Sequence, residues 1–68
     1  MIEFKIEEDY IELIKLLKIT RIAESGAMAK ILVENEEVLR NGTTELRKRA
    51  KIRAGETIEV LGETIRVI

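Results

Sequence analysis

Apolar and polar residues alternate over positions 2–6, Ile-Glu-Phe-Lys-Ile, which predicts a short strand with one buried face. After Asp9 the spacing changes, and apolar residues recur every three or four positions, as they do along one side of a helix. Asp9 and Glu12 have the spacing of a capping box. We therefore expect a helix over residues 10–18 with Asp9 as its N-cap.

A second helix is expected between Ser25 and Asn35. Ser25 is a favoured N-cap residue, and most of the apolar residues in 28–33 fall on one side of the helix that would follow it. Asn35 is a reasonable end point, because asparagine tolerates the left-handed conformation common just after a helix.

The second half of the chain predicts strands joined by tight turns. Asn41-Gly42 is the strongest short-range signal for a two-residue hairpin turn, because both central residues of a type I′ turn need a positive φ. Strands are also expected over residues 57–61 and 64–68, joined at Gly62-Glu63. The predicted order is β-α-α-β-β-β-β, an α+β fold in which two N-terminal helices pack on a small antiparallel sheet.

Composition removes most catalytic and metal chemistry from consideration. The 68 residues contain no cysteine and no histidine, so disulfides, zinc–thiolate sites and the usual neutral-pH base are all excluded. We expect no catalytic residue, no metal, no cofactor and no small-molecule substrate. No apolar run approaches the roughly 20 residues that cross a bilayer, and no signal peptide is visible. The expectation is one cytoplasmic domain over residues 1–68 with no membrane partner.

Charge is distributed unevenly along the chain, although the net charge is only −1. Residues 1–12 hold five acidic side chains and one basic side chain, whereas residues 40–53 hold six basic side chains and one acidic side chain. Local potential, more than net charge, decides where a polyanion docks. Because lysine and arginine supply most of the affinity for phosphates, the second segment predicts a nucleic-acid site.

Both predicted helices add to this positive region. The start of the second helix offers free backbone N–H groups beside Ser25 and Gly26, where an anion can bind and glycine lets it approach closely. Lys30 lies one turn further along the same side. Lys15 and Lys18 form a basic ridge on the first helix.

Aromatic residues are too few to suggest binding of single strands by successive stacking. Phe4 and Tyr10 are the only two, and both are expected in the core. A structured RNA recognised by its shape and phosphates fits this composition better.

The order of these motifs resembles a known family. The segments that carry the resemblance, within residues 10–60, are Leu16-Leu17-Lys18, Ser25-Gly26, Ala29-Lys30, Asn41-Gly42, Glu45 to Arg49, Lys51-Ile52-Arg53 and Gly55 to Val60. They resemble the S-four domain, the αL RNA-binding module first defined in small-subunit ribosomal protein four, and in particular its small stand-alone bacterial members. The resemblance implies binding to structured RNA, chiefly ribosomal or transfer RNA, with the ribosome as a further partner.

The resemblance also implies the RNA-binding residues. They are Lys18, Ser25, Gly26, Lys30, Arg47, Lys48, Arg49, Lys51 and Arg53. Lys15, Arg21 and Arg40 are expected as additional contacts. Arg21 and Glu36 stand where the family usually has glycine, and Arg40 replaces an apolar residue. The alternative is a protein-interaction module that docks through the sheet edge or the acidic residues 1–12, with the basic residues as solvated surface.

Overall fold

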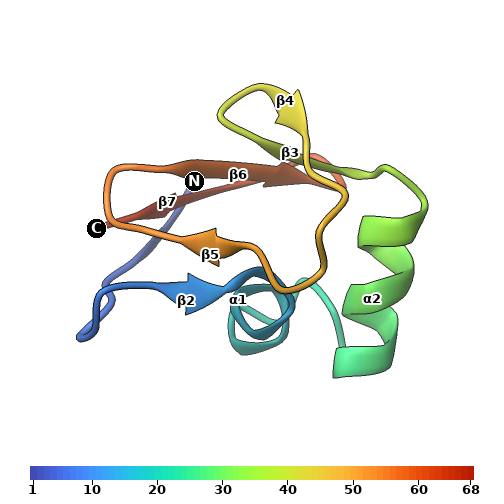
Figure 1. The fold of residues 1–68 in the computed structure, drawn as a ribbon, viewed down its shortest axis with the longest axis horizontal. Coiled ribbons are helices and arrows are strands. Elements are labelled where there is room, and N and C mark those ends of the chain that lie inside the picture. Colours follow the sequence, from blue (N-terminus) through green and yellow to red (C-terminus); the bar gives the residue numbers. More distant parts are fainter.

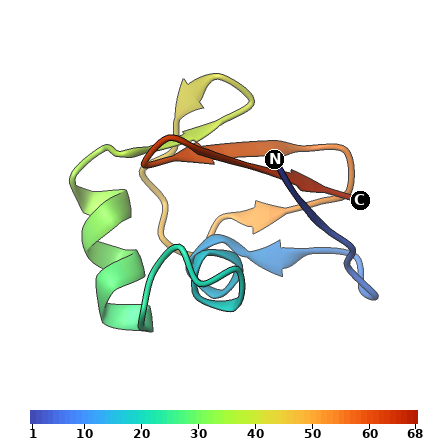
Figure 2. The same cartoon turned by 180° about the vertical axis from the view of Figure 1, so that it is seen from behind.

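A computed structural model describes all residues, 1–68. Its elements in chain order are β1 (Ile2–Phe4), β2 (Ile11–Glu12), α1 (Leu13–Ile19), α2 (Gly26–Glu34), β3 (Val38–Arg40), β4 (Thr43–Thr44), β5 (Lys51–Ile52), β6 (Thr57–Val60) and β7 (Glu63–Val67) (Figure 1). The predicted α+β class, with two helices against a small sheet, is confirmed. Both helices lie on one side of the larger sheet, as the view from behind also shows (Figure 2).

The larger sheet has five strands in the order β1-β7-β6-β3-β4. Every pair is antiparallel except β1 and β7, which run parallel, with Phe4 opposite Val67. The prediction of a wholly antiparallel sheet is therefore wrong at this edge. The two helices and the later hairpins separate β1 from β7 in the chain, so no tight turn forces the two strands to run in opposite directions.

A second, two-stranded sheet joins β2 to β5 and changes where the first helix begins. Ile11 pairs with Ile52, so the chain is extended just before α1. The first amides of α1 donate to the loop that precedes β5, from Leu13 to Ala50 O at 2.9 Å and from Ile14 to Lys48 O at 3.2 Å. These carbonyls replace a side-chain cap.

The predicted start of α1 is therefore wrong. The helix begins at Leu13 rather than at Tyr10, and its N-cap is Glu12, which makes no side-chain capping bond. Asp9 lies outside the helix. The capping-box pattern failed because a distant segment of the chain satisfies the helix amides instead.

The prediction for the start of α2 is confirmed. Ser25 accepts a hydrogen bond from the Met28 amide at 3.2 Å, as an N-cap should. Asn35 is the C-cap, but it has φ −84°, and Glu36 is the residue that takes the left-handed conformation, at φ 60°. Arg21 holds the same position after α1, at φ 64°. Two non-glycine residues thus occupy positions that favour glycine.

The hairpin turn at Asn41-Gly42 is confirmed, with φ values of 51° and 86° between the paired residues Arg40 and Thr43. The later turn lies one residue earlier than predicted. Leu61 and Gly62 form it, with φ 50° and 77°.

The core takes residues from both helices and both sheets. Its largest fully buried side chains are Leu13, Leu16, Leu17, Val33, Val38, Ile52, Ile58, Ile65 and Val67. Phe4 is partly buried and packs against this core. Tyr10 is 37% exposed, so its predicted place in the core is wrong, because it precedes α1 rather than lying on its buried side. Neither helix is long and apolar enough to cross a membrane.

Candidate nucleic-acid interface

The segment of residues 45–53, here called the basic loop, is fixed to the rest of the fold through its backbone and its buried residues. Glu45, Ala50 and Ile52 are buried. The carbonyls of residues 48 and 50 accept the first amides of α1, as described above. The basic side chains between the buried positions therefore point outward.

Arg40 on β3 ties the basic loop to the turn before β6. Its Nε and Nη2 donate to the two carboxylate oxygens of Glu56 at 2.7 and 2.9 Å. Its Nη1 donates to Glu45 Oε1 at 3.1 Å, and its Nη2 donates to the carbonyl of Lys51 at 2.8 Å. Glu56 also accepts the amide of Arg53 at 2.7 Å. The Arg40 cluster, comprising Arg40, Glu45 and Glu56, thus holds both ends of the loop.

These contacts keep the carboxylates of the Arg40 cluster ionised. Hydrogen bonds from the Arg47 side chain, helped by the Arg47 amide and by Arg40, lower the pKa of Glu45 to about 2 against the opposing effect of burial. The hydrogen bond from Arg40 is the main cause of the lowered pKa of Glu56. The same bond raises the pKa of Arg40. All three groups are charged at neutral pH.

The basic side chains of the loop are exposed except for Lys48, which is half-buried, and three of them make ion pairs. Arg47 and Arg49 are 75% and 78% exposed, and Arg49 reaches Glu12 at 3.3 Å. Lys48 reaches Glu34 of α2 at 2.7 Å. Arg47 pairs with the buried Glu45 at 3.2 Å. The pairs of Lys48 and Arg49 lie at the surface, where an ion pair contributes roughly 0–1 kcal/mol, so a phosphate can compete for these two cations.

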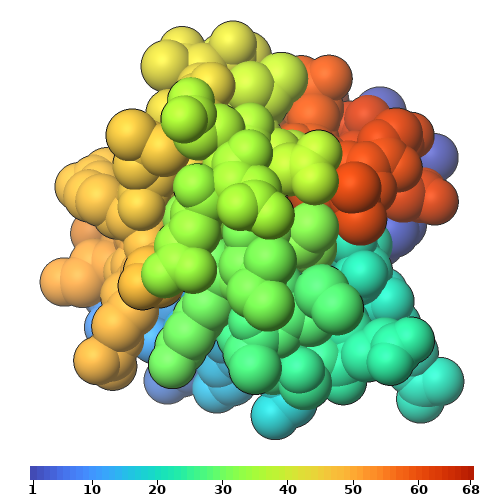
Figure 3. Space-filling model, turned by 90° about the vertical axis from the view of Figure 1, so that its right-hand side faces the viewer, coloured from blue at the N-terminus to red at the C-terminus, as the bar shows by residue number.

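Two adjoining hollows gather the basic side chains. The first, of about 550 Å³, is lined by Arg40, Arg47, Arg49, Ala50, Lys51 and Arg53. The second, of about 500 Å³, is lined by Glu12, Ile14, Lys30, Lys48 and Arg49. Arg49 lines both hollows, so the positive surface is continuous from the loop to Lys30 of α2. The loop and α2 lie side by side on this face (Figure 3).

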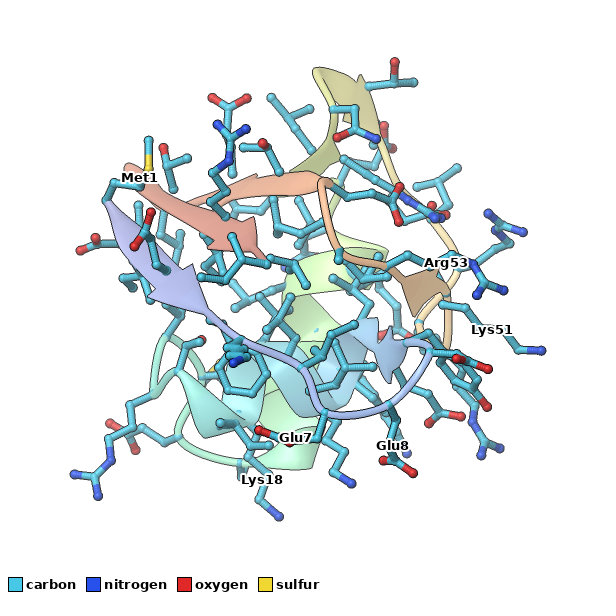
Figure 4. All side chains as sticks on the ribbon, turned by 90° about the vertical axis from the view of Figure 1, so that its left-hand side faces the viewer. Met1, Glu7, Glu8, Lys18, Lys51 and Arg53 are labelled. Carbon is cyan, nitrogen blue, oxygen red and sulfur yellow. The ribbon has the colours of Figure 1, made fainter.

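The remaining predicted residues lie at the margin of this surface or away from it. Lys18 projects from the far end of α1 and is well separated from Lys51 and Arg53 (Figure 4). Lys15 lines a different hollow, together with Glu7 and Glu8. The connector 20–25 lies across α2 from the basic loop (Figure 3), and its Arg21 lines neither basic hollow.

The start of α2 is open to solvent. The hydroxyl of Ser25 is engaged in capping Met28, which leaves the earlier amides of the helix without an intrahelical acceptor. A methyl group built on Gly26 would meet nothing within 4 Å, and the residue does not have a positive φ. The fold itself therefore does not require glycine at this position.

Tyr10 belongs to this face and was not expected there. The Nζ of Lys51 lies 5.1 Å from the centroid of its ring, and Cζ of Arg53 lies 5.8 Å from it. Both distances are within the range of cation–π contacts. The pairing of β2 with β5 brings these residues together, and no local sequence pattern predicts that pairing.

Metal-ligand clusters and unpaired buried polar atoms are absent from the structure. No group of three histidine, cysteine, aspartate or glutamate side chains could hold a metal ion. Every buried polar side-chain atom has a hydrogen-bond partner.

Comparison with known proteins identifies the family. The chain matches the family described as the S4 (S-four) domain over residues 4–68. The chain belongs to the S4 domain family. This S4 domain is 42% identical over 59 residues to the protein named "Putative RNA-binding protein YbcJ" of Escherichia coli (strain K12), covering 87% of this chain and 84% of that protein. A protein of Shigella flexneri named "Uncharacterized protein YbcJ" matches to the same extent.

The S4 domain also superimposes on a solved structure. The solution structure of YbcJ from E. coli, described as revealing an αL motif involved in RNA-binding, matches with a TM-score of 0.77 and 39% identity. The match covers 100% of this chain and 87% of the other. It confirms the αL arrangement that the sequence resemblance implied.

Proposed function

We propose that this S4 domain is a non-enzymatic module, formed by residues 1–68, that binds folded RNA through the basic loop and the adjoining side of α2. The observation that carries the proposal is the pair of connected hollows, whose basic lining comes from Lys30 and from five cations of the loop region in addition to Arg40. The likeness to YbcJ, named as an RNA-binding protein, supports it.

The mechanism is electrostatic docking on a surface that is already in shape. The carbonyls of the loop are held by α1, and its ends are held by the Arg40 cluster, so little order remains to be created on binding. A rigid surface loses less entropy when it associates. Exposed arginines can then fork onto phosphate oxygens, which suits the regular backbone of an RNA helix.

The contacts proposed for RNA are graded by position. The central residues are Lys30, Arg47, Lys48, Arg49, Lys51 and Arg53. Lys15, Lys18, Ser25 and Gly26 are marginal contacts that a long RNA helix reaches. Arg40 acts by positioning the loop, because its guanidinium donors already face Glu45, Glu56 and the Lys51 carbonyl. Arg21 is left out because its connector lies on the other side of α2.

Ribosomal or transfer RNA is the target we propose, on the ribosome or on its own, in the cytoplasm where these RNAs act. Both classes are rich in A-form helices that present phosphates and 2′-hydroxyls, which proteins recognise largely by shape. Neither helix carries the arginine, asparagine or glutamine side chains with which a helix reads a DNA major groove.

The proposal is tested by removing three cations from the basic loop and measuring the salt dependence of RNA binding. The variant changes Arg47, Arg49 and Lys51 to Ala. Its affinity for a fluorescent RNA hairpin should fall, and the slope of log K against log salt should flatten by roughly two to three. Anisotropy titrations at four salt concentrations measure both quantities, and thermal melting checks that the variant is folded.

A control removes cations from elsewhere. It changes Arg21 and Arg66 to Ala, neither of which lines a basic hollow or the hollow of Lys15, Glu7 and Glu8. Its slope should stay close to that of the wild type. If the loop variant keeps the wild-type slope, or if both variants lose affinity equally, the proposed face is wrong. The protein-interaction alternative then becomes the better one.

A further inference from the structure

Tyr10 is an exposed aromatic residue at the border between two surfaces of different chemistry. It lines a hollow of about 450 Å³ beside β1 and α1, and two cations of the basic hollow lie against its ring. The chain has only one other aromatic residue, Phe4. More than a third of Tyr10 faces solvent, although tyrosine rings bury favourably.

The hollow behind Tyr10 differs from the basic hollows in its lining. Half of its residues are apolar: Phe4, Ile6, Tyr10, Ile11 and Ile19. The other five are charged: the carboxylates Glu7, Glu8 and Glu12, and the lysines Lys5 and Lys15. Its volume lies within the range of sites that take small molecules or single groups. With three carboxylates against two lysines, this lining favours a phosphate less than the basic hollow of Arg47 and Lys51 does, and its apolar half suits a flat uncharged ring.

A nucleotide carries both chemistries in one unit. Its phosphate suits Lys51 and Arg53, and its base suits an aromatic ring with apolar neighbours. Carboxylates accept hydrogen bonds from the exocyclic amino groups of bases, as glutamate does from the N4 amino group of cytosine. Lys51 and Arg53 contact Tyr10 on the border, so one nucleotide could engage both surfaces at once.

We propose that the Tyr10 ring stacks on one unpaired, amino-bearing base of the bound RNA, and that Lys51 and Arg53 bind the phosphate of that nucleotide. The inference rests on the proposed RNA binding and adds the kind of RNA feature that is recognised. The basic hollows dock on a helix, and Tyr10 selects helices that carry a bulged or looped-out base. Proteins commonly recognise such unstacked bases in folded RNA.

The test compares three hairpins that differ at a single site: fully paired, with one bulged cytidine, and with one bulged uridine. The wild-type protein should bind the cytidine bulge at least about fivefold more tightly than the paired hairpin, since stacking on an aromatic side chain is worth roughly 1–3 kcal/mol per base. The uridine bulge should fall between them, because uracil replaces the amino group with a carbonyl that faces carboxylates.

Two variants separate stacking from a structural role of the ring. Tyr10→Phe keeps the ring and should keep the preference for the bulge. Tyr10→Leu should lose it while binding the paired hairpin as the wild type does. A bulged 2-aminopurine supplies a direct signal, because its fluorescence should be quenched by the wild type and by Tyr10→Phe but not by Tyr10→Leu.

Each contrary result has a distinct meaning. If the wild type binds paired and bulged hairpins equally, with normal salt dependence, the inference fails and the proposed function stands. If Tyr10→Leu weakens binding to both hairpins by the same factor, the ring only positions Lys51 and Arg53, and the inference also fails. If the wild type binds neither hairpin, the proposed function fails together with the inference.

Discussion

Arg40 and Arg49 lie nine residues apart in the same basic segment, yet the fold uses them in opposite ways. The side chain of Arg40 is 20% exposed, and its donors meet two carboxylates and a backbone carbonyl. The side chain of Arg49 is 78% exposed and makes one surface ion pair, with oxygens of Glu12 at 3.3 Å. A run of basic residues is thus not one functional unit. The buried partners of each cation decide whether it holds the fold or remains available to a ligand.

The largest expected effect on stability comes from removing Arg40, the less exposed of the two arginines. Arg40→Ala leaves the carboxylates of Glu45 and Glu56 close together without their shared cation, and loss of one partner of a largely buried ion pair costs about 3 kcal/mol. For a chain of this size the melting temperature should fall by more than about 10 °C. Urea unfolding measures the loss of free energy.

Arg49→Ala is the matched control, since it removes the same side chain from the surface. Its free energy of unfolding should stay within about 0.5 kcal/mol of the wild type. Arg40→Lys should fall between the two, because lysine keeps the charge but cannot fork onto Glu56. Equal stabilities for Arg40→Ala and Arg49→Ala would remove the distinction between the two arginines.

A second prediction concerns how the stability of the fold depends on pH through Glu45 and Glu56, the carboxylates of the same cluster. The pKa of Glu45 is about 2 in the folded chain, below the ordinary value of 4.5 that applies when the chain unfolds. The unfolded state therefore binds a proton first as the pH falls. The stabilisation from Glu45 is complete above about pH 5, and it is lost between about pH 5 and pH 2. The loss is on the order of 3 kcal/mol, and the lowered pKa of Glu56 adds to it in the same direction.

Glu45→Gln sharpens this prediction. The variant should be less stable than the wild type at pH 7, because Arg40 and Arg47 lose an ionised partner. Its stability should then depend less on pH, so the two curves approach each other toward pH 2. Urea unfolding at several pH values measures both curves. Parallel curves would mean that Glu45 does not carry the acid dependence.

The sequence was informative wherever local rules decide the structure. Asn41-Gly42 formed the expected turn and Ser25 the expected cap, because each needs only its own neighbours in the chain. The start of α1 was wrong because Lys48 and Ala50, more than thirty residues away in the chain, supply the acceptors. The predicted burial of Tyr10 is wrong for the same reason, because it depends on a helix that in fact begins after Tyr10.

The candidate site shows the same contrast between features set by local sequence and features set by distant contacts. The basic composition of the loop could be read directly from the sequence, and the hollows gather most of those residues. The positioning role of Arg40 could not be predicted from the sequence, because it depends on Glu56, which the turn between β5 and β6 brings close. The single acidic residue in the basic segment, Glu45, was the available signal. An acid kept among cations is often their partner.

The smallest effect is expected at Arg21, an exposed arginine with neither role. Its φ of 64° is strained for a residue with a Cβ, so Arg21→Gly should raise the free energy of unfolding by about 0.5 kcal/mol. Arg21→Ala removes the same charge but keeps the Cβ, and it should bring no such gain. Both variants should bind an RNA hairpin within about twofold of the wild type, as measured by anisotropy. A loss of several-fold in both would return Arg21 to the RNA face and show that the bound RNA extends past α2 to the connector.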